Sequence, residues 1–139
     1  MKSQEKCDYY RNRHSCFLLQ YHLVVVTKYR RKVLLEPIAS KLVKLSYMSM
    51  EERWGCRIRE INTDKDHVHI LFDAPPQIKL SSLVNNYKTV TSRLLRKEYK
   101  TVLSKYLWKG QFWSDSYFIC SVSDHNTAIV QKYILNQGG

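Results

Sequence analysis

Two histidines, His67 and His69, are the residues of this chain whose type and spacing most clearly suggest chemistry. They stand in the segment 66–72, which is rich in β-branched and aromatic residues and alternates as a strand does. Side chains two apart in a strand point to the same face, so the two imidazoles are neighbours and the apolar residues around them face a core. Such a pair can hold a divalent metal ion.

The same spacing also fits two histidines on a half-solvated strand that hydrogen-bond to their neighbours. A metal site needs a third protein ligand, or water and substrate oxygens, to complete its shell. Asp64, Asp66 and Asp73 flank the strand and are candidates to hydrogen-bond the histidines from outside such a shell. The choice between the two interpretations therefore depends on what else faces the pair.

The charge of the chain favours a polyanionic partner. Lys and Arg number 23 against 12 Asp and Glu, which gives a net charge of +11, and nucleic acid is the commonest polyanion in the cytosol. Many of the 10 tyrosines stand beside basic residues, as in the segment 28–32. Aromatic rings among positive charges suit unstacked bases and a phosphate backbone. A solvated basic surface over core tyrosines is the alternative.

Length and composition predict one domain in the cytoplasm. The chain has 139 residues, enough for a genuine core, with residues 1–14 as a loose lead-in and 15–139 as the domain. No apolar run is long enough to span a bilayer and the polar start is no signal peptide, so we expect no membrane partner. The four scattered cysteines form no Cys-x-x-Cys pair, which favours reduced thiols over a disulfide framework or a zinc knuckle.

The predicted elements follow the order β-α-β-β-α-β-α. Strands are expected over 17–27, 56–63, 66–72 and 116–123, and helices over about 37–54, 80–99 and 124–137. This is the split βαβ pattern, also called ferredoxin-like or RRM-like: a four-stranded antiparallel sheet with two helices on one face. The histidine pair would then lie on the free face. The expected buried helix positions are Ile38, Leu42, Leu45 and Met48, then Leu83, Tyr87, Val90, Leu94 and Leu95.

The last predicted helix carries Tyr133 and Gln137, which are four residues apart and share one helical face. A tyrosine can act as a nucleophile, and a glutamine carbonyl oxygen can ligate a hard metal ion. By spacing alone, the two residues fit better as one of several tyrosines on an amphipathic helix and a residue at its fraying end. His125, in the first turn of this helix, is expected to face solvent.

Together, the His-x-His strand and the Tyr-x-x-x-Gln helix resemble the single-tyrosine HUH transposases of small bacterial insertion sequences, the TnpA type. The resemblance covers about residues 16–137. It includes the first-strand signature at 21–32, the second helix around 92–96 and a tryptophan-rich segment at 107–118.

By this resemblance, His67 and His69 hold Mg²⁺ or Mn²⁺ with Gln137 as the third protein ligand, and Tyr133 cuts and rejoins single-stranded DNA through a 5′-phosphotyrosine link. His22 is expected to be structural, because the family's ligand pair is the later one. Members of this family recognise DNA hairpins at the ends of the insertion sequence. The resemblance also implies a location in the prokaryotic cytoplasm, at the nucleoid during the reaction. They act as homodimers in which the tyrosine helix of one subunit completes the histidine site of the other. Candidate DNA-backbone contacts are Lys28, Arg30, Arg31, Lys32, Arg93 and Arg96.

Three other functions share parts of this pattern. A non-catalytic RNA- or single-strand-binding module of the same fold would carry stacking aromatics on its open face, where this chain offers imidazoles. A relaxase or replication initiator usually has a longer chain and a differently ordered fold. A transposase-derived protein that serves its host at repeated palindromes would keep the same site residues.

Overall fold

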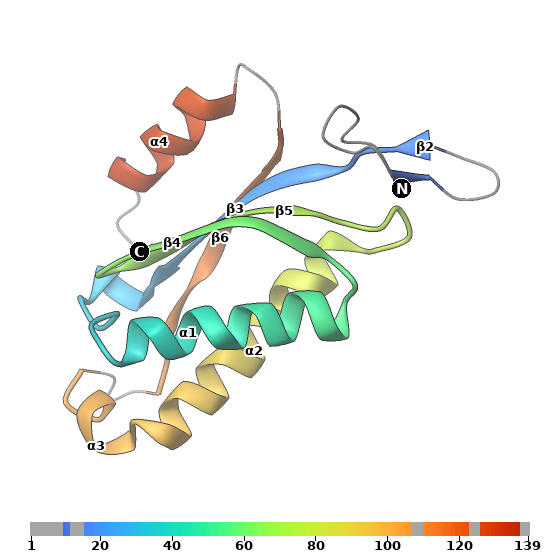
Figure 1. Ribbon diagram of the computed structural model, residues 1–139. Coiled ribbons are helices and arrows are strands. Elements are labelled where there is room, and N and C mark those ends of the chain that lie inside the picture. Colours follow the sequence, from blue (N-terminus) through green and yellow to red (C-terminus); the bar gives the residue numbers. More distant parts are fainter. Residues whose placement is uncertain (1–9, 12–15, 107–109, 123–125, 137–139) are drawn as a thin grey trace.

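The structure is a computed structural model that describes residues 10–11, 16–106, 110–122 and 126–136. Its main sheet has four antiparallel strands in the order β4-β5-β3-β6, which confirms the predicted split βαβ fold (Figure 1). Two short strands, one of them inside the expected lead-in, pair separately. The strands are β1 (Tyr10–Arg11), β2 (Cys16–Phe17), β3 (Gln20–Thr27), β4 (Arg57–Asp64), β5 (His67–Asp73) and β6 (Trp113–Ser121).

Helices lie on both faces of this sheet (Figure 1). The two long helices α1 and α2 cover one face, and α4 lies across the other, which sequence analysis expected to be free. The helical elements are η1 (Lys28–Arg30), α1 (Ile38–Tyr47), η2 (Met48–Arg53), α2 (Leu80–Glu98), α3 (Lys100–Leu103) and α4 (Asn126–Asn136). None of the helices in the described part of the chain is long and apolar enough to cross a membrane.

The register between β3 and β5 decides which side chains face which layer. Leu23 pairs with Ile70 and Val25 with Val68, and all four side chains are buried in the main core under α1 and α2. Their neighbours in sequence therefore point to the other face. That second face, called here the histidine face, carries His22, Val24 and Val26 on β3 and His67, His69 and Leu71 on β5.

A β-bulge in β4 adds residues to the histidine face. Ile58 pairs with Phe72 on the core face, but the register then shifts, so that Glu60 pairs with Leu71 and Ile61 with Ile70. The extra residue reverses the alternation. Glu60 therefore lies on the histidine face, where plain alternation from Ile58 would have placed it in the core.

The first helix differs from prediction at its end. The sequence predicts one α-helix to about residue 54 with Met48 on its buried side, but the chain turns into the wider η2 at Met48. A π-type turn carries an additional residue, which rotates the following side chains. Met48 is 37% exposed, whereas Ser49 and Met50 are buried.

Two further corrections concern the packing of α2 and the start of β6. Val90 and Leu94 were predicted to be buried but are only half-buried. Val84 and Thr91 are buried in their place. Thr91 is tolerated there because its hydroxyl accepts a hydrogen bond from Trp113 Nε1 at 3.0 Å and donates one to a carbonyl of the preceding helical turn. Trp113 pairs with β3, so β6 begins three residues before the predicted start at 116.

Candidate active site

His67 and His69 project from the same face of β5, as the alternation predicts. His67 Nδ1 lies 2.9 Å from Asp66 Oδ1. This hydrogen bond fixes the imidazole and leaves Nε2 as the nitrogen that can face a metal ion, an arrangement common around metal-bound histidines. Of the three aspartates considered from sequence, Asp66 alone contacts a histidine within the described residues; Asp73 pairs with Arg59, and Asp64 accepts a hydrogen bond from a backbone N–H.

Asp66 is held in its ionised form. Burial raises its pKa, but hydrogen bonds from Arg30 and His67 and the charges of the same groups outweigh this, so the pKa is lowered overall. Arg30 Nε donates to Asp66 Oδ2 at 3.0 Å, and Arg30 Nη2 donates to Oδ1 at 3.3 Å. The ionised carboxylate can therefore keep its bond to His67.

His69 is in contact with a third imidazole, that of His22. His22 Nδ1 lies 3.0 Å from His69 Nε2, and the two rings stack with centroids 5.1 Å apart. The pKa of His69 is lowered by burial first and then by His22 and His67, against an opposing effect of Glu60. Burial likewise lowers the pKa of His22, again opposed by Glu60. His22 thus contacts a predicted metal ligand, which is compatible with the structural role expected of it.

Tyr133 lies on the same side of the sheet as the histidines. It is carried by α4 and packs with Val24, Val26 and Phe118, the last with ring centroids 4.9 Å apart. Its hydroxyl oxygen is buried and makes no hydrogen bond of normal geometry with any described residue. Burial raises its pKa, and Ser116 and Arg30 act in the opposite direction.

Tyr133 packs over the strands β3 and β6, whereas His67 and His69 project from β5. Phe118, Val24 and His69 form one row across β6, β3 and β5. Neighbouring strands lie about 4.8 Å apart, so the β6 backbone at Phe118 is roughly 10 Å from the β5 backbone at His69. In this arrangement the Tyr133 ring packs against Phe118 and a cluster of buried valines, and its hydroxyl oxygen is buried.

The described residues of the site supply some, but not all, of the ligands that a divalent cation needs. Two histidines share a face, one of them has its carboxylate partner, and Glu60 adds a negative charge nearby. Gln137, the predicted third ligand, and His125 lie outside the described residues. Among the residues that are described, no three His, Cys, Asp or Glu side chains converge as a complete ligand set. A metal ion here would need the glutamine, water or phosphate oxygens as additional ligands.

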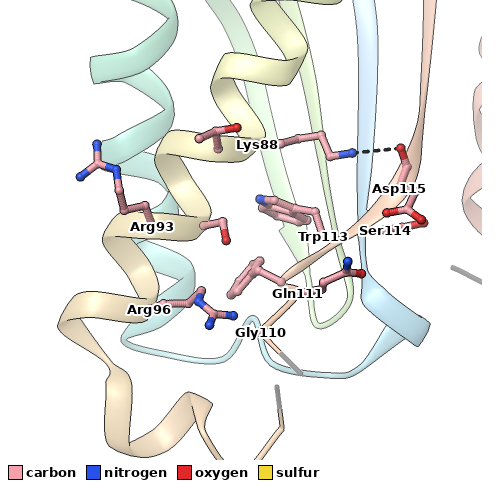
Figure 2. A pocket seen from close by; sticks show the side chains of 11 residues that line it. Lys88, Arg93, Arg96, Gly110, Gln111, Trp113, Ser114 and Asp115 are labelled. Atoms are coloured by element: carbon pink, nitrogen blue, oxygen red, sulfur yellow. Dashed lines mark hydrogen bonds between the residues drawn. The ribbon is translucent and has the colours of Figure 1, made fainter. Parts of the chain in front are cut away.

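A basic groove lies on the other side of the sheet, between α2 and the start of β6 (Figure 2). Its volume is about 510 Å³, and its lining includes Lys88, Arg93 and Arg96 from α2. Lys88 Nζ donates to the Asp115 carbonyl at 3.1 Å, whereas neither arginine has an ion-pair partner within the described part of the chain. Phe112 and Trp113 border the groove, but both rings are buried.

The remaining basic residues that are candidates for DNA contacts differ in whether their side chains already bind other parts of the protein. Lys28 forms an exposed ion pair with Asp115 at 3.5 Å, Arg31 donates to the Tyr106 carbonyl, and Lys32 is exposed. Arg30 is committed to internal contacts, which a sequence pattern of consecutive basic residues does not reveal.

Comparison with known families assigns the protein to a class of DNA-processing enzyme. The model of the family described as "Transposase IS200 like" matches residues 15–137. The chain belongs to the IS200-like transposase family, whose members cleave DNA and transfer strands.

Individual relatives agree with this assignment. The chain is 33% identical to the ISDra2 transposase TnpA of Deinococcus radiodurans over 121 residues, covering 87% of this chain and 85% of that protein. It is 31% identical over 128 residues to the transposase for insertion sequence element IS200 of Salmonella typhimurium, covering 89% of this chain and 80% of that protein.

Solved structures give the same fold. The crystal structure of a proposed transposase from Deinococcus radiodurans superposes with a TM-score of 0.81 at 30% identity, covering 92% of this chain and 97% of the other. A REP-associated tyrosine transposase bound to a REP hairpin matches with a TM-score of 0.55 at 14% identity, covering 90% and 68% respectively. The second likeness concerns the fold alone.

Proposed function

We propose that this chain is an HUH-type transposase that cuts and rejoins single-stranded DNA at the ends of an insertion sequence through a 5′-phosphotyrosine intermediate. The observation that carries the proposal is that the histidine pair and the helix of Tyr133 share one face of the sheet. Membership of the transposase family supplies the reaction class. A covalent intermediate conserves the phosphodiester bond energy, so that rejoining needs no ATP.

In the proposed reaction, Tyr133 Oη attacks the scissile phosphorus and forms a bond to the 5′-phosphate. The bond from phosphorus to the 3′-oxygen breaks, and that oxygen leaves as a 3′-hydroxyl after taking up a proton. The phenol must lose its own proton, and a phenol ordinarily titrates near pH 10. Arg30 and Ser116 favour the ionised phenol, which offsets part of the effect of burial on its pKa.

His67 and His69, with Gln137, would hold Mg²⁺ or Mn²⁺. The bound ion would polarise the scissile phosphate and neutralise charge that develops during the attack. Asp66 orients the first of these ligands by its hydrogen bond to His67 Nδ1. His22 occupies the Nε2 atom of the second ligand and has to turn away if that nitrogen is to bind the ion.

The buried position of the Tyr133 hydroxyl supports an active arrangement that differs from this one. The Tyr133 hydroxyl has to become accessible before it can meet a phosphate near the histidines. We propose that this happens in a homodimer, where α4 of one subunit completes the histidine site of the other. A monomeric form would then be inactive.

The proposed DNA substrate is single-stranded at the cut and paired in hairpins at the ends. Arg93 and Arg96 in the basic groove, together with Lys28, Arg31 and Lys32, are candidates for contacts to the phosphate backbone. The groove supports backbone contact rather than base stacking, because its two aromatic rings are buried and offer no free face.

A covalent-capture assay tests the proposed chemistry. The protein is mixed with labelled single-stranded DNA from the flanks of its own gene, with and without Mn²⁺, and separated under denaturing conditions. A metal-dependent adduct that is lost in Tyr133→Phe and retained in Tyr47→Phe supports the proposal; Tyr47 is a partly exposed tyrosine on the opposite layer. Tight DNA binding without any adduct would instead indicate a non-catalytic binding module of the same fold.

A further inference from the structure

We infer that Arg30 is a positioning residue that joins the histidine strand to the tyrosine helix, and is not a DNA contact. The inference rests on the proposed function. The Arg30 guanidinium binds Asp66 through two nitrogens, and its third nitrogen, Nη1, donates to the Ile134 carbonyl oxygen at 2.7 Å. Asp66 directly precedes β5, and Ile134 lies in α4, 104 residues after Arg30 in the chain.

On one side, Arg30 controls the direction of His67. A guanidinium presents its donors in a planar fork, so a two-point contact fixes the carboxylate in rotation as well as in distance. Asp66 Oδ1, which receives one of these contacts, is the same atom that lies 2.9 Å from His67 Nδ1. The chain of contacts therefore determines that His67 presents Nε2, and not Nδ1, to a metal ion.

On the other side, Arg30 fixes the last turn of the tyrosine helix. The final carbonyl groups of a helix have no partner within it, and a cation there also interacts favourably with the helix dipole. The Ile134 carbonyl is one of these groups, directly after Tyr133. Burial raises the pKa of the Tyr133 phenol, and the positive charge of Arg30 opposes part of this rise. One side chain thus acts on the predicted nucleophile and on a predicted ligand.

The backbone around Arg30 is shaped for this role. Tyr29 and Arg30 have φ values of 59° and 52°, in the left-handed region that non-glycine residues rarely adopt. Consecutive residues stay in this region only where surrounding contacts hold them. The Arg30 side chain is 21% exposed, whereas Lys32, two residues later, is exposed. Arg30 is therefore poorly placed to meet a phosphate, and Lys32 is its natural comparison.

Four proteins separate a positioning role from a DNA contact: wild type, Arg30→Gln, Arg30→Lys and the charge-matched control Lys32→Gln. For each, Mn²⁺ affinity is measured by calorimetry without DNA, hairpin affinity by fluorescence anisotropy at several salt concentrations, and adduct formation by covalent capture. Amide hydrogen exchange of α4 reports docking of the helix independently of any chemistry.

We expect Arg30→Gln to lose about 10-fold or more in Mn²⁺ affinity and in adduct formation, as is typical when the partner of a metal ligand is disturbed. Exchange in the last turn of α4 should accelerate. Hairpin affinity should stay close to that of wild type, whereas Lys32→Gln, at a candidate DNA contact, should lose affinity. Arg30→Lys keeps the positive charge but loses the planar guanidinium with its several donors. It should therefore restore only part of the protection of the α4 amides against hydrogen exchange.

The opposite pattern overturns the inference: unchanged Mn²⁺ affinity and unchanged α4 exchange in Arg30→Gln, with weaker hairpin binding and a salt slope reduced by about 1. A wild-type protein that forms no adduct would refute the proposed chemistry instead. In that case the exchange of α4 in Arg30→Gln still decides whether Arg30 holds the helix.

Discussion

His22 Nδ1 and His69 Nε2 lie 3.0 Å apart, within hydrogen-bond distance, on the face of the sheet that also receives the tyrosine helix. One of the two nitrogens must carry the proton, since two lone pairs would repel each other. A metal ion that binds His69 through Nε2 therefore has to replace His22. The two histidines are coupled, so that a change at one residue alters what the other can bind.

The first prediction concerns this competition. Removing the imidazole in His22→Ala frees His69 Nε2, so Mn²⁺ affinity should rise by about 5-fold, the equivalent of one hydrogen bond worth roughly 1 kcal/mol. Titration calorimetry without DNA measures the change, with His69→Ala as the variant that should lose binding. A fall in Mn²⁺ affinity in His22→Ala would show that His22 is itself a ligand.

The second prediction concerns the pH dependence of stability in metal-free protein. The pKa values of His22 and His69 are lowered in the folded state, with burial as the main cause, whereas Glu60 opposes the shift for both and His67 adds to it for His69. The unfolded chain binds protons near pH 6.5 that the folded chain does not, so stability is present above that pH and declines as the pH falls below it.

We therefore expect the midpoint temperature of thermal unfolding, measured in EDTA, to decrease as the pH is lowered from about 7.5 to about 5. This range brackets the histidine pKa of the unfolded chain. The decline should be shallower in His22→Gln, which cannot be protonated. The lowered pKa of Asp66 belongs to a separate and more acidic window, because its contribution is lost only as the carboxylate is protonated. An identical pH profile in His22→Gln and wild type would contradict the prediction.

The third prediction concerns the basic groove. Arg93→Gln and Arg96→Gln each remove one positive charge from its lining, so DNA affinity should fall and the slope of log K against log salt should decrease by about 0.9 for each lost phosphate contact on paired DNA. Arg53→Gln, an exposed arginine outside the groove, serves as the control. Equal effects of all three substitutions would mean that only the overall charge matters.

The fourth prediction separates the chemistry of Tyr133 from its packing. The hydroxyl is buried without a hydrogen bond of normal geometry to the described residues, and the ring packs on Phe118. Tyr133→Phe keeps this packing, so the free energy of unfolding in urea should change by less than about 1 kcal/mol. A loss well above that value would show that the hydroxyl has a structural partner, and loss of the adduct could then no longer be assigned to chemistry alone.

The fifth prediction concerns the core face of the histidine strand. Phe72 is fully buried and packs against Tyr21, with ring centroids 5.7 Å apart. Phe72→Ala should lower the free energy of unfolding by about 3–5 kcal/mol. Leu71→Ala, on the histidine face of the same strand and half-buried, should cost clearly less. Comparable losses in the two variants would contradict the assignment of the faces.

The sequence was sufficient for the order of the elements and for the sheet, because both depend on local periodicity. The alternation in 66–72 placed His67 and His69 on one face, and the split βαβ order followed from the spacing of strands and helices. The motifs also identified the family, which the comparisons confirm over residues 15–137. The proposed roles of His67, His69, Tyr133 and Gln137 stay predictions.

Long-range contacts were beyond the reach of the sequence. His22 was expected to be structural, but its contact with His69 could not be predicted. Arg30 was a candidate DNA contact, but its bonds to Asp66 and to the Ile134 carbonyl could not be predicted. Glu60 reaches the histidine face through a bulge whose position depends on pairing with β5. The reason is physical: periodicity along one strand or helix fixes a side chain relative to its own element, whereas the register between elements decides which side chains meet. The sequence by itself thus determined the fold and the family of this protein, and the tertiary structure decided which residues surround the candidate site.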